Sequence, residues 1–150
     1  TLNKSNINYV IVYPNNDHGS KFILNEVLKL KRKKNFKIFP SIRFEYYLTF
    51  LKNSMFVIGN SSSGIMEAPY YGVPTINLGD RQKNRLRSNL IKNIKFNEKS
   101  ILTSIQFFKN RKFSHQKYFG KGNSANKIIK LLKTNKIWKI SNQKNFIDIL

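Results

Sequence analysis

Short apolar runs alternate with amphipathic segments along most of this 150-residue chain. The runs are rich in β-branched and aromatic side chains, which predicts buried strands at 7–13, 36–39, 55–58, 73–78 and 91–94. Between them, apolar residues recur at helical spacing, which predicts helices after Ser20 and over 43–52, 63–71, 98–108 and 124–133. Strands that alternate with helices form βαβ units. We therefore expect an α/β fold, a Rossmann-like parallel sheet with helices on both faces.

Residues that commonly begin or end helices stand at several of these boundaries. Ser20, Asn97 and Ser124 each precede a helical pattern and predict N-caps, while Gly72 predicts a C-cap. Residues 14–17 predict a turn, 79–90 a basic loop and 111–123 an irregular segment, and no structure is assigned from 134 onward.

The charge of the chain is strongly positive, with 28 Lys and Arg against 7 Asp and Glu and a net charge of +21. Basic residues occur throughout rather than in one block, so we attribute most of this charge to general composition and solvated faces. An acidic partner domain and real affinity for nucleic acid or membrane stay open as alternatives.

Several classes of protein are disfavoured by composition. The chain has no cysteine, which excludes disulfides and cysteine zinc sites, and no apolar run long enough to span a membrane. It begins with Thr1, and we expect a piece of a longer, cytoplasmic protein. The seven acids form no pair or cluster that suggests a metal site, and His18 and His115 are expected at the surface.

The run Gly59-Asn60-Ser61-Ser62-Ser63-Gly64 follows a predicted strand directly and precedes a predicted helix. Such a junction presents backbone N–H groups and hydroxyls at a helix N-terminus, where anions bind, although this segment taken alone is explained more simply as an ordinary turn capped by serine. The carboxylate of Glu67 can accept hydrogen bonds from the hydroxyls of a ribose, and the guanidinium of Arg81 can donate hydrogen bonds to phosphate. Ligands of parallel sheets bind at the carboxyl ends of strands, where Asn15 also lies. The combination favours a nucleotide.

No catalytic group is assigned to this chain. Ser61 has no nearby histidine, and both the P-loop and the Gly-x-Gly-x-x-Gly pattern are absent, which disfavours ATP hydrolysis and nicotinamide chemistry. We expect no cofactor and no metal.

Two longer segments, Gly59 to Pro69 and Gly72 to Arg85, resemble the signature of the UDP-N-acetylglucosamine 2-epimerases, most closely that of the hydrolysing branch. The segments 13–20, 43–52 and 118–123 are also similar to that branch. The resemblance covers about residues 8–133 and departs at Asn84, where glycine is more usual.

The resemblance implies the C-terminal, nucleotide-binding half (1–133, with a tail at 134–150) of a GT-B-type enzyme of two Rossmann-like domains. Ser61 and Ser62 would hold the diphosphate, Glu67 the ribose, Arg81 the phosphate or ribose side, and the Ile42 backbone the uracil, with Asn15 nearby. The acid and base carboxylates would belong to the missing N-terminal half.

The implied partners are a UDP-sugar, that missing domain and, in a homo-oligomer, further copies of the enzyme, and the implied role is in sialic-acid-type sugar synthesis. Another GT-B enzyme, such as a glycosyltransferase, stays the alternative, and a nucleic-acid-binding domain is the less favoured one.

Overall fold

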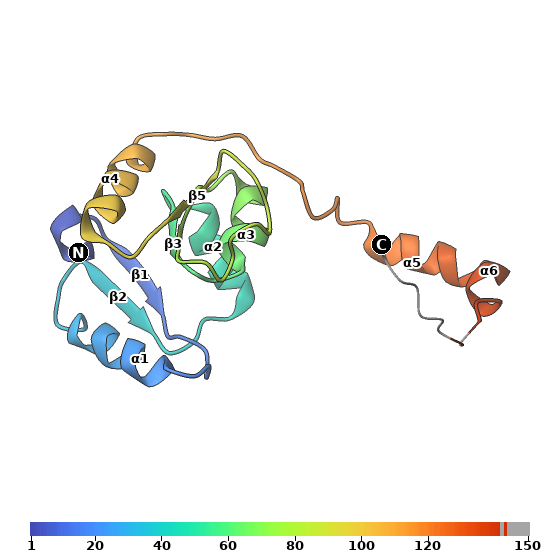
Figure 1. Ribbon diagram of the computed structural model, residues 1–150, viewed down its shortest axis with the longest axis horizontal. Helices are drawn as coiled ribbons and strands as arrows, with labels where there is room; N and C mark the ends of the chain where they lie inside the picture. Colours follow the sequence, from blue (N-terminus) through green and yellow to red (C-terminus); the bar gives the residue numbers. More distant parts are fainter. Residues whose placement is uncertain (142, 144–150) are drawn as a thin grey trace, which may run out of the picture. The chain divides into compact units, whose positions relative to one another are not determined.

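A computed structural model describes residues 1–141 and 143 and divides the chain into two units, 1–116 and the part from 117 onward. The first unit contains the strands (Figure 1). Its elements in order are η1 (Leu2–Ser5), β1 (Tyr9–Val12), α1 (Ser20–Lys29), β2 (Phe36–Phe39), α2 (Phe44–Lys52), β3 (Val57–Gly59), α3 (Ser63–Met66), η2 (Ala68–Tyr71), β4 (Thr75–Leu78), β5 (Ile91–Ile94) and α4 (Glu98–Lys109). The second unit contains α5 (Ser124–Leu132) and α6 (Asn135–Trp138).

All the strand pairs are parallel, which confirms the predicted α/β class. The hydrogen bonds nevertheless form two sheets rather than one: β1 with β2, and β3–β4–β5 with β4 in the centre. Side-chain packing, rather than backbone hydrogen bonding, joins β1 to β3. The rings of Tyr9 and Phe56 pack edge to face, with their centroids 6.5 Å apart. The sequence patterns predicted the strands but not this division.

Strand β4 shows why helices cover both faces of its sheet. Its first three residues are all buried, and their side chains alternate in direction. Thr75 Oγ1 donates to the Gly64 carbonyl of α3 at 2.7 Å, whereas Ile76 packs in a core cluster with Ile105 and Phe108 of α4. A second cluster joins α2 to η2. The predicted arrangement of helices on both faces is therefore confirmed.

The predicted helix over 63–71 is interrupted. Its α-helical part ends at Met66, and η2 follows as a 3-10 turn that Gly72 ends at φ 70°. Pro69 explains the change, because it has no N–H to donate to the carbonyl one α-helical turn earlier. Strand β4 also begins at Thr75, two residues later than predicted.

The cap predictions have different outcomes. Asn97 is confirmed, since its side chain accepts the N–H of Ser100 at 2.8 Å. The predictions for Ser20 and Ser124 are wrong, because each is the first helical residue. Gly19 and Asn123 occupy the N-cap positions and make no side-chain hydrogen bond there. Gly19 has a φ of 83°, a left-handed conformation that glycine adopts without strain.

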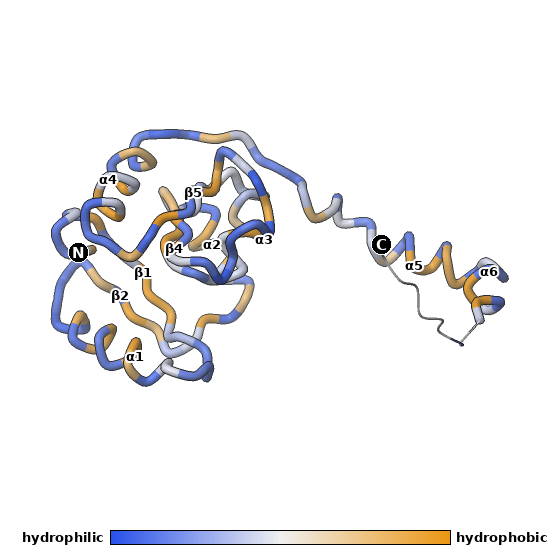
Figure 2. The backbone as a smooth tube through the Cα atoms, viewed as in Figure 1, coloured by the Kyte–Doolittle hydropathy of each residue, from blue (hydrophilic) through white to orange (hydrophobic). Residues whose placement is uncertain are grey.

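In the second unit, α5 and α6 have no buried residue among those described. Hydrophobic and hydrophilic residues alternate along α5 (Figure 2). Part of the tail over 134–150, for which no structure was assigned, is helical as α6; the stretch from 144 onward, like 142, lies outside the described residues. No helix in the described part of the chain is both long and apolar enough to cross a bilayer.

Candidate nucleotide site

Five of the six residues predicted to bind a ligand follow the carboxyl ends of strands, and the sixth, Glu67, lies between the end of α3 and the start of η2. Asn15 follows β1, Ile42 follows β2, Ser61 and Ser62 follow β3, and Arg81 follows β4. Ile42 is half-buried and the other four are exposed. Parallel strands end at the same edge of a sheet, which is where α/β folds bind ligands.

An ion pair joins the loop after β4 to the loop after β1. Arg81 Nη1 lies 3.3 Å from Asp17 Oδ2, and both side chains are more than half exposed. An exposed pair of this kind contributes little to stability, so the guanidinium remains available to an anionic ligand. Asn15, two residues before Asp17, makes no side-chain hydrogen bond within the described residues. Asp17 was not among the predicted site residues.

A second contact joins the loop after β4 to the loop after β3. Gln82, with 4% of its surface exposed, donates from Nε2 to the carbonyl of Asn60 at 3.1 Å. Its Oε1 is buried and has no hydrogen-bond partner in the part of the chain that the structure describes. The sequence did not predict the burial of Gln82, because it is a polar residue between two basic ones.

The segment from Gly59 to Ser62, here called the serine loop, presents several donors to solvent. Ser61 Oγ accepts the N–H of Ser63 at 3.3 Å, and the Ser61 carbonyl accepts the N–H of Gly64. Among the described residues, the N–H groups of Ser61 and Ser62 have no partner. Because α3 has only four residues, its macrodipole is small, and these local donors supply most of the attraction for an anion. The anion site predicted at this helix N-terminus therefore depends on local N–H groups and hydroxyls rather than on the helix itself.

Tyr47 of α2 distinguishes the third serine from the other two. Its hydroxyl forms a hydrogen bond with the hydroxyl of Ser63, which leaves Ser61 and Ser62 as the serines open to a ligand. Burial raises the pKa of Tyr47, the bond to Ser63 opposes that shift, and the negative charge of Glu67 adds to it. Glu67 is half-buried and lies close enough to affect the phenol. Tyr47 was not among the predicted site residues.

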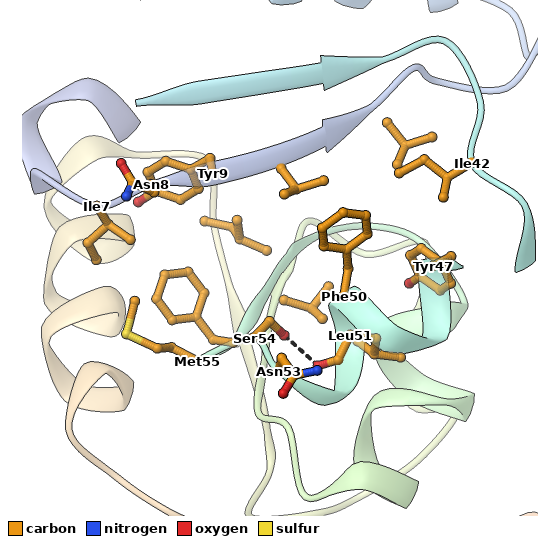
Figure 3. Close-up of a pocket in the computed structure, with 15 residues that line it drawn as sticks. Ile7, Asn8, Tyr9, Ile42, Tyr47, Phe50, Leu51, Asn53, Ser54 and Met55 are labelled. Carbon is orange, nitrogen blue, oxygen red and sulfur yellow. Dashed lines mark hydrogen bonds between the residues drawn. The ribbon is translucent and has the colours of Figure 1, made fainter. Parts of the chain in front are cut away.

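A cleft of about 340 Å³ lies between β1 and the segment 53–58 (Figure 3). Most of its lining is apolar, and Ile42, Tyr47 and Phe50 lie at the end of the cleft near the carboxyl end of β1. Ile42 is thus brought near Tyr47, the residue that connects the cleft to Ser63 and Glu67.

Comparison with known families shows to which proteins this chain is related. The family model described as UDP-N-acetylglucosamine 2-epimerase matches residues 1–133. The chain belongs to the UDP-N-acetylglucosamine 2-epimerase family. A UDP-N-acetylglucosamine 2-epimerase of Neisseria meningitidis is 42% identical over 152 aligned residues, which cover 99% of this chain and 40% of that protein.

Two further relatives show how far the likeness extends. The GDP/UDP-N,N'-diacetylbacillosamine 2-epimerase (hydrolyzing) of Campylobacter jejuni is 42% identical over 79 residues, 51% of this chain and 21% of that protein. The crystal structure of a Methanocaldococcus jannaschii UDP-GlcNAc 2-epimerase, in complex with UDP-GlcNAc and UDP, superposes with a TM-score of 0.66 at 19% identity. That match covers 87% of this chain and 46% of the other, and it shows a shared fold. The chain thus spans about two fifths of the length of the Neisseria relative.

Proposed function

We propose that this chain is the nucleotide-binding part of a UDP-N-acetylglucosamine 2-epimerase and that it holds the UDP moiety of the substrate. The observation that carries the proposal is the joining of three loops at the carboxyl ends of the strands. Asp17 contacts Arg81 at 3.3 Å. Gln82, which follows Arg81 in the sequence, contacts Asn60 at 3.1 Å, and Asn60 directly precedes the two exposed serines.

Each group has a role that follows from its chemistry. The free N–H groups and hydroxyls of Ser61 and Ser62, together with the Arg81 guanidinium, donate hydrogen bonds to the diphosphate. The carboxylate of Glu67 accepts hydrogen bonds from the ribose hydroxyls. The Ile42 backbone binds the uracil, and Asn15 lies near the nucleotide. These residues hold the leaving group and do not themselves act on the sugar.

We infer that the parent enzyme is of the hydrolysing branch and gives UDP and N-acetylmannosamine by elimination followed by addition of water. The motif segments 59–69 and 72–85 support this branch, as does the similarity to a relative from Campylobacter jejuni whose name includes the hydrolysing reaction. The groups that act as acid and base in that reaction belong to the remainder of the parent protein.

A nucleotide panel combined with a turnover assay tests this proposal. We expect the chain to bind UDP weakly but more tightly than ADP or GDP, because the site would select the base as well as the diphosphate. Incubated with UDP-N-acetylglucosamine, the chain should release no N-acetylmannosamine. Equal affinity for all three diphosphates would contradict a UDP site, and clear turnover would contradict the assignment of catalysis to the remainder of the enzyme.

A further inference from the structure

We propose that Gln82 is a positioning residue of the nucleotide site: its buried carboxamide fixes the serine loop and Arg81 relative to one another, so that both reach one diphosphate. This inference rests on the proposed function above and adds to it a residue that does not itself touch the ligand.

The burial of Gln82 is unusual for its surroundings. Arg81 and Lys83 on either side are exposed, whereas Gln82 is 4% exposed. The other buried polar residues of the described chain, Thr75, Asn77 and Ser104, lie within β4 or α4. Gln82 alone among these four lies in a loop, where a side chain could reach solvent easily.

The contact that Gln82 makes connects the two parts of the site directly. Its acceptor, the carbonyl of Asn60, belongs to the residue before Ser61, and Gln82 itself is the residue after Arg81. Gly59 and Gly79, where the two loops leave their strands, have φ values of 148° and 75°. Glycine can adopt backbone conformations that other residues cannot, so a further contact is needed to hold the two loops in one conformation.

The unpartnered Oε1 indicates that stability alone does not explain this residue. A buried amide oxygen without a donor is destabilising, and an apolar side chain of equal length would avoid that penalty. Asn60 is exposed, so water could replace the lost donor at its carbonyl. The amide is therefore best explained by the geometry that it imposes on the loops.

Variants of Gln82 separate positioning from a merely structural role. Gln82→Met removes the donor at nearly constant length, and Gln82→Asn keeps the carboxamide but is too short to reach Asn60. For both we expect UDP affinity to fall about threefold to tenfold, the range for one lost hydrogen bond, while the melting temperature of Gln82→Met stays equal or rises. Gln116→Met is the matched control, since Gln116 bonds Ser88 and Asn89 in another part of the unit, and it should leave UDP affinity unchanged.

A double-mutant cycle with Arg81→Ala gives the decisive readout. If Gln82 positions Arg81, the loss of UDP affinity on Arg81→Ala is smaller in the Gln82→Met background than in the wild type. Additive losses, or a lower melting temperature of Gln82→Met with unchanged UDP affinity, would overturn the inference while leaving the UDP site intact. If Gln82→Met does not fold, Gln82→Asn with unchanged UDP affinity overturns it equally. A wild-type chain that binds no UDP would overturn the proposed function as well.

Discussion

At the scale of single residues, the sequence predicted which types of side chain the candidate site contains but not the contacts that they make in the folded chain. Glu67 and Arg81 were predicted from the chemistry of carboxylates and guanidinium groups. That Ser63 differs from Ser61 and Ser62 could not be predicted, because the difference comes from Tyr47, which lies on another helix. Asp17 and Gln82 were missed for the same reason: each enters the site through a contact that is distant in sequence.

The bond between Tyr47 and Ser63 makes a testable contribution to stability. Tyr47→Phe removes the phenol hydroxyl, and we expect a loss of about 1 kcal/mol in the free energy of unfolding, typical of one intramolecular hydrogen bond. Denaturant unfolding near neutral pH measures this loss. Tyr46→Phe is the matched control on the same helix, because Tyr46 is exposed and no hydrogen bond of its hydroxyl is found in the described chain.

The raised pKa of Tyr47 also gives this pair a dependence on pH. Its pKa in the folded chain lies above the ordinary value of 10.0. The stability that Tyr47 contributes to the fold is therefore complete below pH 10.0 and is lost as the pH rises through the pKa of the folded chain. Tyr47→Phe should therefore lose less stability than the wild type above pH 10.0. An equal alkaline loss in Tyr47→Phe and the wild type would exclude this group as the cause.

At the scale of elements, local sequence predicted where helices and strands occur better than how they begin and end. Asn97 and Ser20 have equally favourable residue types for capping, yet only Asn97 has an extended backbone that lets its side chain reach the N–H of Ser100. The interruption of the 63–71 helix was in principle predictable from Pro69, whereas the division between β1 and β3 depends on side chains that meet only in the folded chain.

The packing of α3 against β4 depends on the lack of a side chain at Gly64. A Cβ there would lie 2.6 Å from Thr75 Cγ2, so Gly64→Ala should displace α3 and destabilise the chain by about 1–3 kcal/mol. Thr75→Ser removes that methyl group and keeps the hydroxyl that donates to the Gly64 carbonyl. The double variant should recover part of the loss in thermal unfolding. Failure of Thr75→Ser to restore any stability would contradict this steric explanation.

At the scale of the whole molecule, the predicted class, the helices on both faces and the family are confirmed, while the single sheet is not. The net charge of +21 is less informative about function than the placement of the acids. The described ion pairs engage Asp17, Glu26, Glu45, Asp80 and Glu98. Glu67 is in none of these pairs, so none of them competes with a ligand for its carboxylate.

Calorimetric titration of UDP into the wild-type chain and Glu67→Gln tests the central claim most directly. Glu67→Gln keeps the shape of the side chain but replaces the charged acceptor for the ribose. We expect saturable binding to the wild type and about tenfold or greater weakening in Glu67→Gln, as for a lost charge-assisted hydrogen bond. Glu26→Gln, which changes an exposed carboxylate of α1 paired with Lys29, should bind UDP as the wild type does. Equal affinity of the wild type and Glu67→Gln would contradict a ribose-binding role for Glu67 and with it this account of the site.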